Sequence, residues 1–366
     1  MKLTPSICLL IVSMACFDAI HAQDTTMTLE EYNPKSTLVV PGSEITKAKY
    51  PFIDIHSHQW RLATQDVNQL ISDMDRLNMQ VMINLSGRSG QALADNVNAV
   101  ERVAPGRVLN FANIDFSNMD DPDWSERTVA QLRKDVENGA AGLKIFKNLG
   151  LTVLDANGRV PADDPRVDPV WALCGELGIP VLIHTGEPAV FWDTIDEHNE
   201  RWLEMKQFPN RHRGDSTRYP SWEIVINEQW NIFRKHPNTT FINAHMGWMA
   251  NDLERLGNHL DEFPNVVTEI GAILAELGRQ PRFAREFFIR YQDRILFGKD
   301  SWRPEEYNVY FRVLESSDEY FDYYRKRHAF WKMYGLDLPD EVLRKLYYKN
   351  ALRILPGIDP TLFPTD

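Results

Sequence analysis

Residues 51–58, PFIDIHSH, decide the fold of this chain. A short apolar run ends here in two histidines, His56 and His58. Successive side chains of a strand point to opposite faces, so these two share one face and can serve one point in space. A single His-x-His motif occurs often by chance, and in isolation it would be interpreted by default as two exposed or core histidines without a functional role. Its meaning therefore depends on the rest of the chain.

Seven further segments show the same pattern of a short apolar run that ends in polar residues. They cover residues 79–85, 107–113, 141–147, 179–184, 239–245, 265–270 and 294–299. Amphipathic stretches typical of helices lie between them, at residues 66–78, 91–103, 125–138, 168–178, 222–236, 251–263 and 281–292. Eight strand-then-helix units predict parallel strands with helical crossovers. We therefore expect an α/β protein of the (β/α)₈ TIM-barrel class.

Three further strand ends carry side chains that can bind a metal. His184 ends the fifth predicted strand, His245 ends the sixth, and Asp300 follows the eighth. Barrel enzymes place their active sites at the C-terminal ends of the strands. Imidazole nitrogens and one carboxylate suit zinc or another divalent transition metal. The other histidines for which we expect a surface role are His236, His259 and His328.

The motifs at these strand ends resemble those of the amidohydrolase superfamily. They are DIHSH (54–58), GLKI (142–145), IHTG (183–186), NAHMG (243–247) and FGKDS (297–301). The closing KNALRIL (349–355) resembles the ending of the branch that contains aminocarboxymuconate-semialdehyde decarboxylase and several lactonases. The resemblance runs from about Phe52 to Pro356. It is specific for the superfamily and not for a substrate.

Carried over to these positions, the resemblance implies a divalent metal held by His56, His58, His184 and Asp300. Zinc is the expected metal, and a single ion is favoured. His245 is implied to bind the metal or to transfer protons. The chemistry of the residue types agrees, because a divalent ion lowers the pKa of a coordinated water. Asp300 can then orient that water and pass its proton to a leaving group.

Lys144 has two alternative roles under the same resemblance. Carbamylated, it would bridge a second metal ion; as a cation, it would bind a substrate carboxylate. Further substrate contacts are expected from residues at strand ends and in a long polar and aromatic insertion, 187–221, which we interpret as a lid. These candidates are Arg88, Trp192, Arg218, Trp302 and Arg303. Aromatic faces stack on rings and guanidinium pairs with carboxylate or sulfate, although packing explains the same residues.

The N-terminus predicts export. Residues 1–22 combine a charged start, an apolar run over 7–16 and a small last residue, which is typical of a signal peptide. The run is too short to span a bilayer. The alternative is a lipoprotein anchored through Cys16. Cleavage before Gln23 leaves Cys174 as the lone cysteine, which rules out an internal disulfide and suits a periplasmic enzyme.

Four segments are expected: the signal peptide (1–22), a polar lead-in (23–50), the barrel (51–356) and a tail (357–366). Extra C-terminal helices, over residues 307–334 and 340–355, are candidates for a homodimer interface. The formal net charge of −12 argues against nucleic acid and anionic membranes as partners.

The function expected from these observations is an exported, metal-dependent hydrolase. Its substrate would be a small carboxylate or sugar acid carrying a lactone, ester or amide, or a short acidic oligosaccharide. The alternative is a lyase on the same site, either a decarboxylase or a dehydratase or hydratase of a uronate-type sugar. A binding protein on a decayed barrel is disfavoured, because every expected ligand position is filled.

Overall fold

The computed structural model describes residues 26–326 and 328–365 and contains one parallel sheet of eight strands. In sheet order the strands are β1 (Phe52–Ser57), β2 (Met79–Asn84), β3 (Val108–Asn113), β4 (Ala140–Ile145), β7 (Val181–Ile183), β8 (Phe241–Asn243), β9 (Val266–Glu269) and β10 (Ile295–Leu296). The backbone N–H of Ile55 donates to the carbonyl of Phe297 at 3.0 Å, and Ser57 bridges to Asp300. These contacts join the first strand to the last, so the predicted (β/α)₈ TIM barrel is confirmed.

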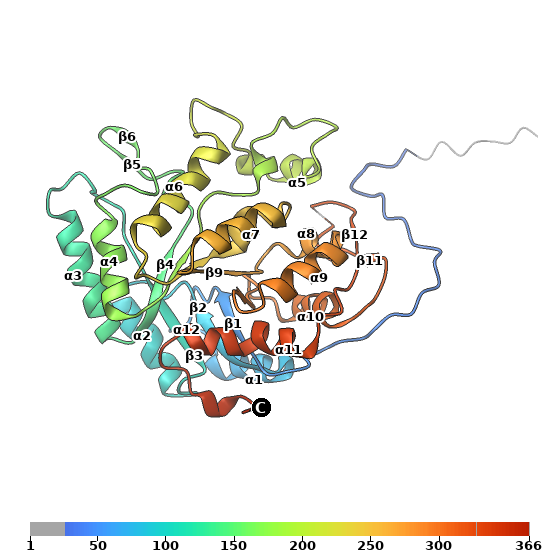
Figure 1. Ribbon diagram of the computed structural model, residues 1–366, viewed down its shortest axis with the longest axis horizontal. Helices are drawn as coiled ribbons and strands as arrows, with labels where there is room; N and C mark the ends of the chain where they lie inside the picture. The colour runs from blue at the N-terminus through green and yellow to red at the C-terminus, as the bar shows by residue number, and fades with distance from the viewer. Residues whose placement is uncertain (1–25, 327, 366) are drawn as a thin grey trace, which may run out of the picture. The chain divides into compact units, whose positions relative to one another are not determined.

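Helices between the strands cover the outside of the barrel (Figure 1). They are α1 (Val67–Leu77), α2 (Gly90–Glu101), α3 (Trp124–Glu137), α4 (Asp168–Leu177), α6 (Trp222–Lys235), α7 (Leu253–Glu262) and α9 (Pro281–Arg290). The first of them shows why they form where they do. The Asp66 side chain accepts the N–H of Gln69 at its start, and Asn78 ends it in the left-handed conformation. Its buried side chains recur at helical spacing and face the sheet.

The expected insertion after the fifth barrel strand and the C-terminal helices are both present. The insertion contains η1 (Ala189–Phe191), α5 (Trp202–Gln207) and η2 (Pro209–Arg211). The C-terminal region contains α10 (Tyr307–Glu315), α11 (Asp340–Arg344), η5 (Lys345–Lys349) and α12 (Asn350–Ile354). Smaller elements are the β5–β6 hairpin (Leu154–Asp155, Gly158–Arg159), η3 (Ala244–Trp248), α8 (Leu274–Arg279), η4 (Pro304–Glu306) and η6 (Pro360–Leu362).

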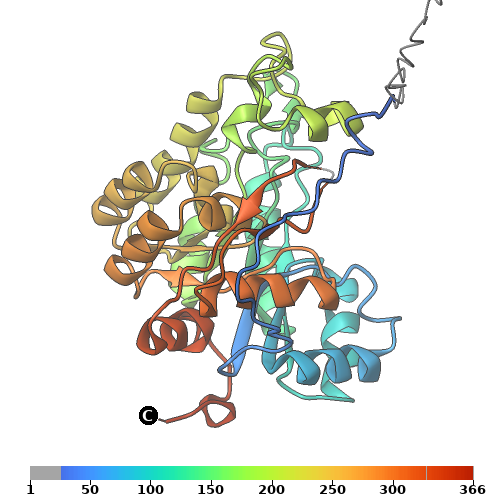
Figure 2. The same cartoon turned by 90° about the vertical axis from the view of Figure 1, so that its right-hand side faces the viewer.

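Residues 307–334, expected to be helical, are helical only in their first part. Helix α10 ends at Glu315, and β11 (Phe321–Asp322) and β12 (Lys332–Met333) then form an antiparallel hairpin. In the segment that joins the two strands, the ring of Tyr323 packs on those of Tyr324 and Trp331, and these contacts accompany the hairpin in place of a helix. Figure 2 shows the hairpin in orange between α10 and the insertion.

The N-terminal predictions meet the structure only in part. The predicted signal peptide, residues 1–22, and Cys16 lie outside the described residues. The chain divides into two compact units, Met1–Thr37 and Leu38–Asp366. Within the second unit, Ser43 donates its backbone N–H and its hydroxyl to Asp318, which fixes the end of the lead-in. Among the residues that the structure describes, no helix has the length and apolar character needed to cross a membrane.

Arg201 anchors the insertion to the rest of the barrel. Its guanidinium donates to Glu204 at 2.9 Å and to Glu276 of α8 at 2.6 Å. It also lies 3.3 Å from Nδ1 of His328, whose ring contacts the hydroxyl of Tyr323 at 3.1 Å. The expected surface role of His328 is therefore wrong, because this network holds its ring in the interior. The insertion is fixed at its α5 end to two other parts of the chain.

Replacing Arg201 with methionine is expected to lower the free energy of unfolding by about 3 kcal/mol, since Glu204 and Glu276 would stay buried without that counter-charge. Urea denaturation of the purified variant measures the change. Arg218→Met is the control, because Arg218 of the same insertion is exposed and should change stability by less than about 0.5 kcal/mol. Equal stability of the two variants would contradict the anchoring role.

Candidate metal centre

Two histidines and one carboxylate converge where the barrel closes. Nε2 of His56 lies 3.6 Å from Oδ1 of Asp300, and Nε2 of His58 lies 3.5 Å from the same oxygen. The ligand atoms of these three residues all lie within 4.8 Å of one another. Asp300 reaches the histidines because its backbone N–H donates to the carbonyl of His56 at 2.6 Å. Three of the four predicted metal ligands thus come together at the ends of β1 and β10.

Glu269, at the end of β9, fixes the orientation of His56. Its buried carboxylate accepts the Nδ1–H of His56 at 2.9 Å and also accepts the backbone N–H groups of His245 and Gly271. His56 therefore presents a lone pair on Nε2, an atom that is buried without a hydrogen-bond partner among the described residues. Metal-binding histidines are commonly held in this way by a carboxylate on the second nitrogen.

Sequence reasoning assigns this orienting role to neither Glu269 nor Ser86. The hydroxyl of Ser86 lies 2.7 Å from Nδ1 of His58. The signal for Glu269 is present in its position at a strand end. Ser86 carries no such signal, because serine is common in loops after strands.

His184 and His245 form a second pair. Nδ1 of His245 lies 2.7 Å from the carbonyl of Gly271, which can only accept, so this nitrogen carries the proton. Nε2 of His245 faces Nδ1 of His184 at 3.3 Å, and one of these two nitrogens donates to the other. When His184 donates from Nδ1, its lone pair lies on Nε2. That Nε2 is buried and has no hydrogen-bond partner among the described residues, as a metal ligand would require.

An unusual backbone turn positions His245. Residues 245–248 all have positive φ, at 57°, 52°, 61° and 58°. Only Gly247 adopts this conformation without strain, and each of the other three costs about 1–2 kcal/mol. The turn folds Trp248 back onto His245, with ring centroids 4.4 Å apart and planes 29° apart. Strain of this kind is concentrated at functional sites.

The protonation states of the cluster suit a divalent cation. Burial, with a smaller effect from Lys144, holds the pKa of His56 well below its ordinary value, and burial lowers the pKa of His58 to about 4. Burial raises the pKa of Asp300, but interaction with His56, His245, His58 and Lys144 outweighs it and lowers that pKa to about 2. Neutral imidazoles beside an ionised carboxylate are the donor set that zinc and similar ions prefer. The residues therefore fit a metal ion.

Lys144, on β4, is close enough to the same cluster to interact electrostatically with His56, His58 and Asp300. Its side chain is buried, and no described protein atom is a hydrogen-bond partner of Nζ. Burial lowers the pKa of Lys144 to about 7, against the opposing effect of Asp300 and Glu269. Neutral and charged forms are thus both present near neutral pH. The first form is needed for carbamylation and the second for binding a carboxylate, so both predicted roles remain.

An aromatic surface borders the site at the barrel entrance. The ring of Trp60 stacks on His58 at 5.2 Å and on Phe146 at 6.0 Å, and 58% of Trp60 is exposed. Arg88, predicted to bind substrate, is exposed beside it and points a guanidinium N–H at the Trp60 carbonyl, 3.5 Å away. Sequence reasoning missed Trp60, because a tryptophan in a loop does not reveal whether it is exposed.

The other predicted substrate residues have local partners. Nε1 of Trp192 donates to the carbonyl of Pro220 at 2.8 Å, within the insertion, and the exposed Arg218 lies over the ring of Tyr219. After Asp300, Trp302 packs on Tyr307 at 5.6 Å, and the exposed Arg303 is 3.9 Å from Glu306. Among the described contacts, none joins Trp192 or Arg218 to the histidine cluster.

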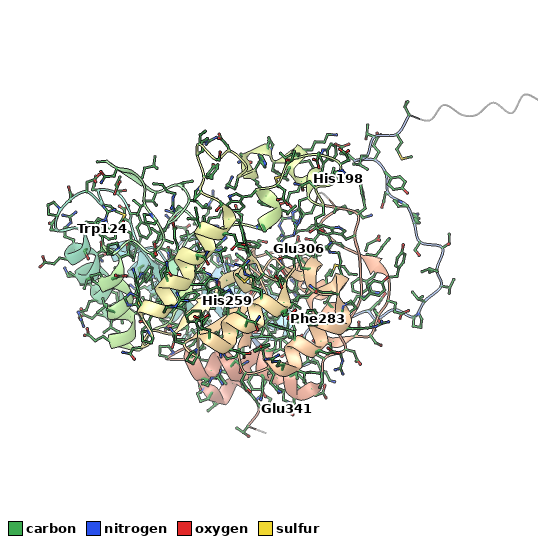
Figure 3. All side chains as sticks on the ribbon, turned by 45° about the horizontal axis from the view of Figure 1, so that its top comes forward. Trp124, His198, His259, Phe283, Glu306 and Glu341 are labelled. Carbon is green, nitrogen blue, oxygen red and sulfur yellow. The ribbon has the colours of Figure 1, made fainter. Side chains whose placement is uncertain are left out.

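Two other histidines lie away from the cluster and are labelled in Figure 3. His198 is exposed in the insertion. His259, on α7, stacks on Trp230 at 3.9 Å. Neither takes part in the site.

Comparison with known proteins places this geometry in context. The family model described as amidohydrolase matches residues 53–357. No curated protein matches the chain significantly. A TIM-barrel protein from Bordetella bronchiseptica is 16% identical, with 83% of this chain and 97% of that chain covered and a TM-score of 0.51. An amidohydrolase from Staphylococcus aureus is 15% identical, with 84% of this chain and 99% of that chain covered and a TM-score of 0.51. 4-Oxalomesaconate hydratase from Rhodopseudomonas palustris is 13% identical, with 85% of this chain and 97% of that chain covered and a TM-score of 0.50. Likeness at these identities concerns the fold alone.

Proposed function

Because the chain belongs to the amidohydrolase family, we propose that it is a metal-dependent hydrolase that opens a lactone, ester or amide of a small carboxylate or sugar acid. The observation that carries the proposal is the convergence of His56 Nε2, His58 Nε2 and Asp300 Oδ1. His184 supplies the fourth ligand of the proposed set. The nitrogen-rich set favours a single zinc ion.

A divalent ion held by these residues would supply an acidic water and polarise the substrate carbonyl. Two residues of the chain, Asp300 and His245, carry out the proton transfers. Asp300, ionised because its pKa is about 2, accepts the proton of the attacking water and delivers it to the leaving group. His245 keeps His184 in the ligand tautomer and is the second proton-transfer group of the proposal.

The barrel entrance supports a ring-shaped, anionic substrate. The exposed face of Trp60 offers a stacking surface beside the metal ligands. Arg88, beside Trp60, and Lys144, next to the cluster, would pair with a substrate carboxylate. Trp302 and Arg303 lie on the loop that follows Asp300 and complete the proposed substrate contacts. Trp192 and Arg218 belong to the insertion and are secondary in this proposal.

The location belongs to the proposal as well. We infer that the chain is exported through residues 1–22 and works in the periplasm as the form beginning at Gln23, or attached to the membrane through a lipidated Cys16. The chain carries a strongly negative net charge, so its partners would be small acidic molecules rather than nucleic acid.

The reaction type is tested with isotopic water. Zinc-loaded protein is incubated in ¹⁸O-labelled water with a set of lactones, uronates and phenolic acids. The ¹⁸O content of the products is then measured by mass spectrometry. A hydrolase breaks the lactone, ester or amide bond and places one ¹⁸O atom in the carboxylate that forms. Release of CO₂, loss of water without label, or addition of labelled water as a hydroxyl across a C=C bond would instead establish the lyase alternative on the same residues.

A further inference from the structure

The position of the Asp300 carboxylate depends on its backbone. Of the Asp300 side chain 33% is exposed, and no hydrogen bond from the described residues holds its carboxylate. The residue has a φ of 82°, which is uncommon outside glycine and persists only where the surrounding structure enforces it. Its N–H donates to the carbonyl of His56, which holds it from the N-terminal side. The contacts on its C-terminal side therefore help to decide where the carboxylate points.

The next residue, Ser301, is held at two atoms. Nζ of Lys299 donates to its carbonyl at 2.7 Å, and Nη2 of Arg325 donates to its hydroxyl at 2.9 Å. Both cations also donate to one oxygen of Glu306, which is labelled in Figure 3, at 2.7 and 3.0 Å. Arg303 approaches the other oxygen at 3.9 Å. Two cations that share one carboxylate thus hold the loop that follows β10.

Of these two cations, Arg325 comes from outside the loop. It lies in the segment that joins β11 to β12. His328 of the same segment lies 3.3 Å from the guanidinium of Arg201 in the insertion, and the ring of Trp331 lies 4.8 Å from that guanidinium. The segment is therefore fixed to the insertion on one side and to the loop after β10 on the other.

Charge balance indicates what Arg325 contributes. Glu306 is a single carboxylate, and the fully buried ammonium of Lys299, 2.7 Å away, already neutralises it. Removing Arg325 would leave no buried charge without a partner in this group, so the fold should tolerate the change. The contact that Lys299 does not supply is the hydrogen bond to the Ser301 hydroxyl.

We propose that Arg325 is a positioning residue for Asp300. By holding the Ser301 hydroxyl and Glu306, it fixes the backbone that directs the Asp300 carboxylate toward the two histidines of the site. Functional sites tolerate displacements of only about 0.5 Å, so a released loop would weaken metal binding and misplace the proposed base. The inference rests on the proposed function, because it takes Asp300 as metal ligand and base, but it holds for a hydrolase and a lyase alike.

The test measures zinc affinity by competition with a chromophoric chelator, which needs no substrate. Arg325→Met removes both hydrogen bonds and is expected to weaken zinc affinity about 10-fold, as the loss of a group that orients a metal ligand does. Arg325→Lys keeps the charge and can restore one of the two contacts, so it should recover part of the loss. With a substrate from the labelled-water screen, Arg325→Met should lower kcat and leave KM within about 2-fold, because Arg325 is not a proposed substrate contact.

Arg312→Met is the matched control. Arg312 also binds a carboxylate, that of Asp318 at 2.6 Å, and lies over the ring of Phe321 in β11 at 4.0 Å. Among the described contacts, none joins it to residues 299–306. The control should lower the free energy of unfolding, measured with urea, and leave zinc affinity unchanged. Equal losses of affinity in the Arg325→Met and Arg312→Met proteins would overturn the proposal, because the hairpin would then act through general stability alone.

Ser301→Ala covers the case in which Arg325→Met fails to fold. It removes only the hydroxyl that accepts from Arg325 and should weaken zinc affinity about 3-fold, the effect of one hydrogen bond. Where Arg325→Met folds, the double variant should bind zinc no more weakly than Arg325→Met alone, because both changes remove the same contact. Additive losses, or wild-type affinity in Ser301→Ala, would contradict the positioning role.

Asp300→Asn separates this inference from the proposed function. If Asp300→Asn loses zinc affinity while Arg325→Met and Ser301→Ala bind as the wild type does, the metal centre stands and the positioning role fails. If Asp300→Asn binds zinc like the wild type, the proposed centre fails and takes the positioning role with it. Losses in all three variants without hydrolysis of any labelled substrate would remove the hydrolase and leave the positioning role standing.

Discussion

Asp300→Asn is expected to lower kcat by about 10³-fold, because it removes both an anionic ligand of the proposed metal and the base that accepts the proton of the attacking water. Asparagine is the suitable replacement, since Asp300 has a φ of 82° and asparagine tolerates positive φ better than alanine. Metal content by atomic emission should fall together with kcat. The measurement uses the substrate identified in the labelled-water screen.

Asp121→Asn serves as the control for charge alone, because Asp121 lies exposed before α3 and pairs only at the surface with Arg127. It should leave kcat and metal content unchanged. An Asp300→Asn protein that is folded, binds zinc normally and turns over at the wild-type rate would remove Asp300 from the mechanism.

Glu269→Gln is expected to weaken zinc affinity by about 10- to 100-fold, the usual effect of losing a group that holds a metal-binding histidine. Glutamine keeps the size of the side chain but loses the charge that holds the Nδ1 proton of His56. Affinity is measured by competition with a chromophoric chelator, which reports on the site without any substrate. The activity at saturating zinc should recover in part.

Glu187→Gln is the matched control for this variant. Glu187 is also a buried carboxylate near the barrel entrance, but it pairs with Lys147 at 2.5 Å and with Arg213 at 3.4 Å rather than with a histidine. The zinc affinity of the Glu187→Gln protein should equal that of the wild type. A Glu269→Gln protein with unchanged affinity would show that His56 is held well enough by its own packing.

The fold was predictable because its signals are local. Each barrel strand is a short apolar run, and each outer helix shows a buried stripe at helical spacing, so both could be placed within a few residues of their observed bounds. The β11–β12 hairpin was not predictable in this way. Its aromatic residues, among them Tyr323 and Trp331, suit a helix or a strand equally, and only their packing on one another decides.

The site was predictable as far as strand ends could show it. The sequence predicts three residues of the site, because each stands at or just after the end of an apolar run: His56, His58 and Asp300. The structure brings them together. The orienting contacts could not be foreseen, because they join residues far apart in sequence: Glu269 with His56, and Ser86 with His58. The insertion was misleading for another reason, since its tryptophans and arginines look the same in sequence whether they bind a ligand or pack against each other.

The closure of the barrel links the site to the integrity of the whole molecule. The first strand and the last meet through few backbone hydrogen bonds, and β10 is only two residues long. The proposed ligand atoms His56 Nε2 and Asp300 Oδ1 belong to the first strand's side and the last strand's side of this closure. An ion bound to both would cross-link two strands that lie at opposite ends of the barrel sequence. Because it binds only the folded state, its binding would raise the free energy of unfolding by mass action. Thermal stability should therefore rise with free zinc concentration.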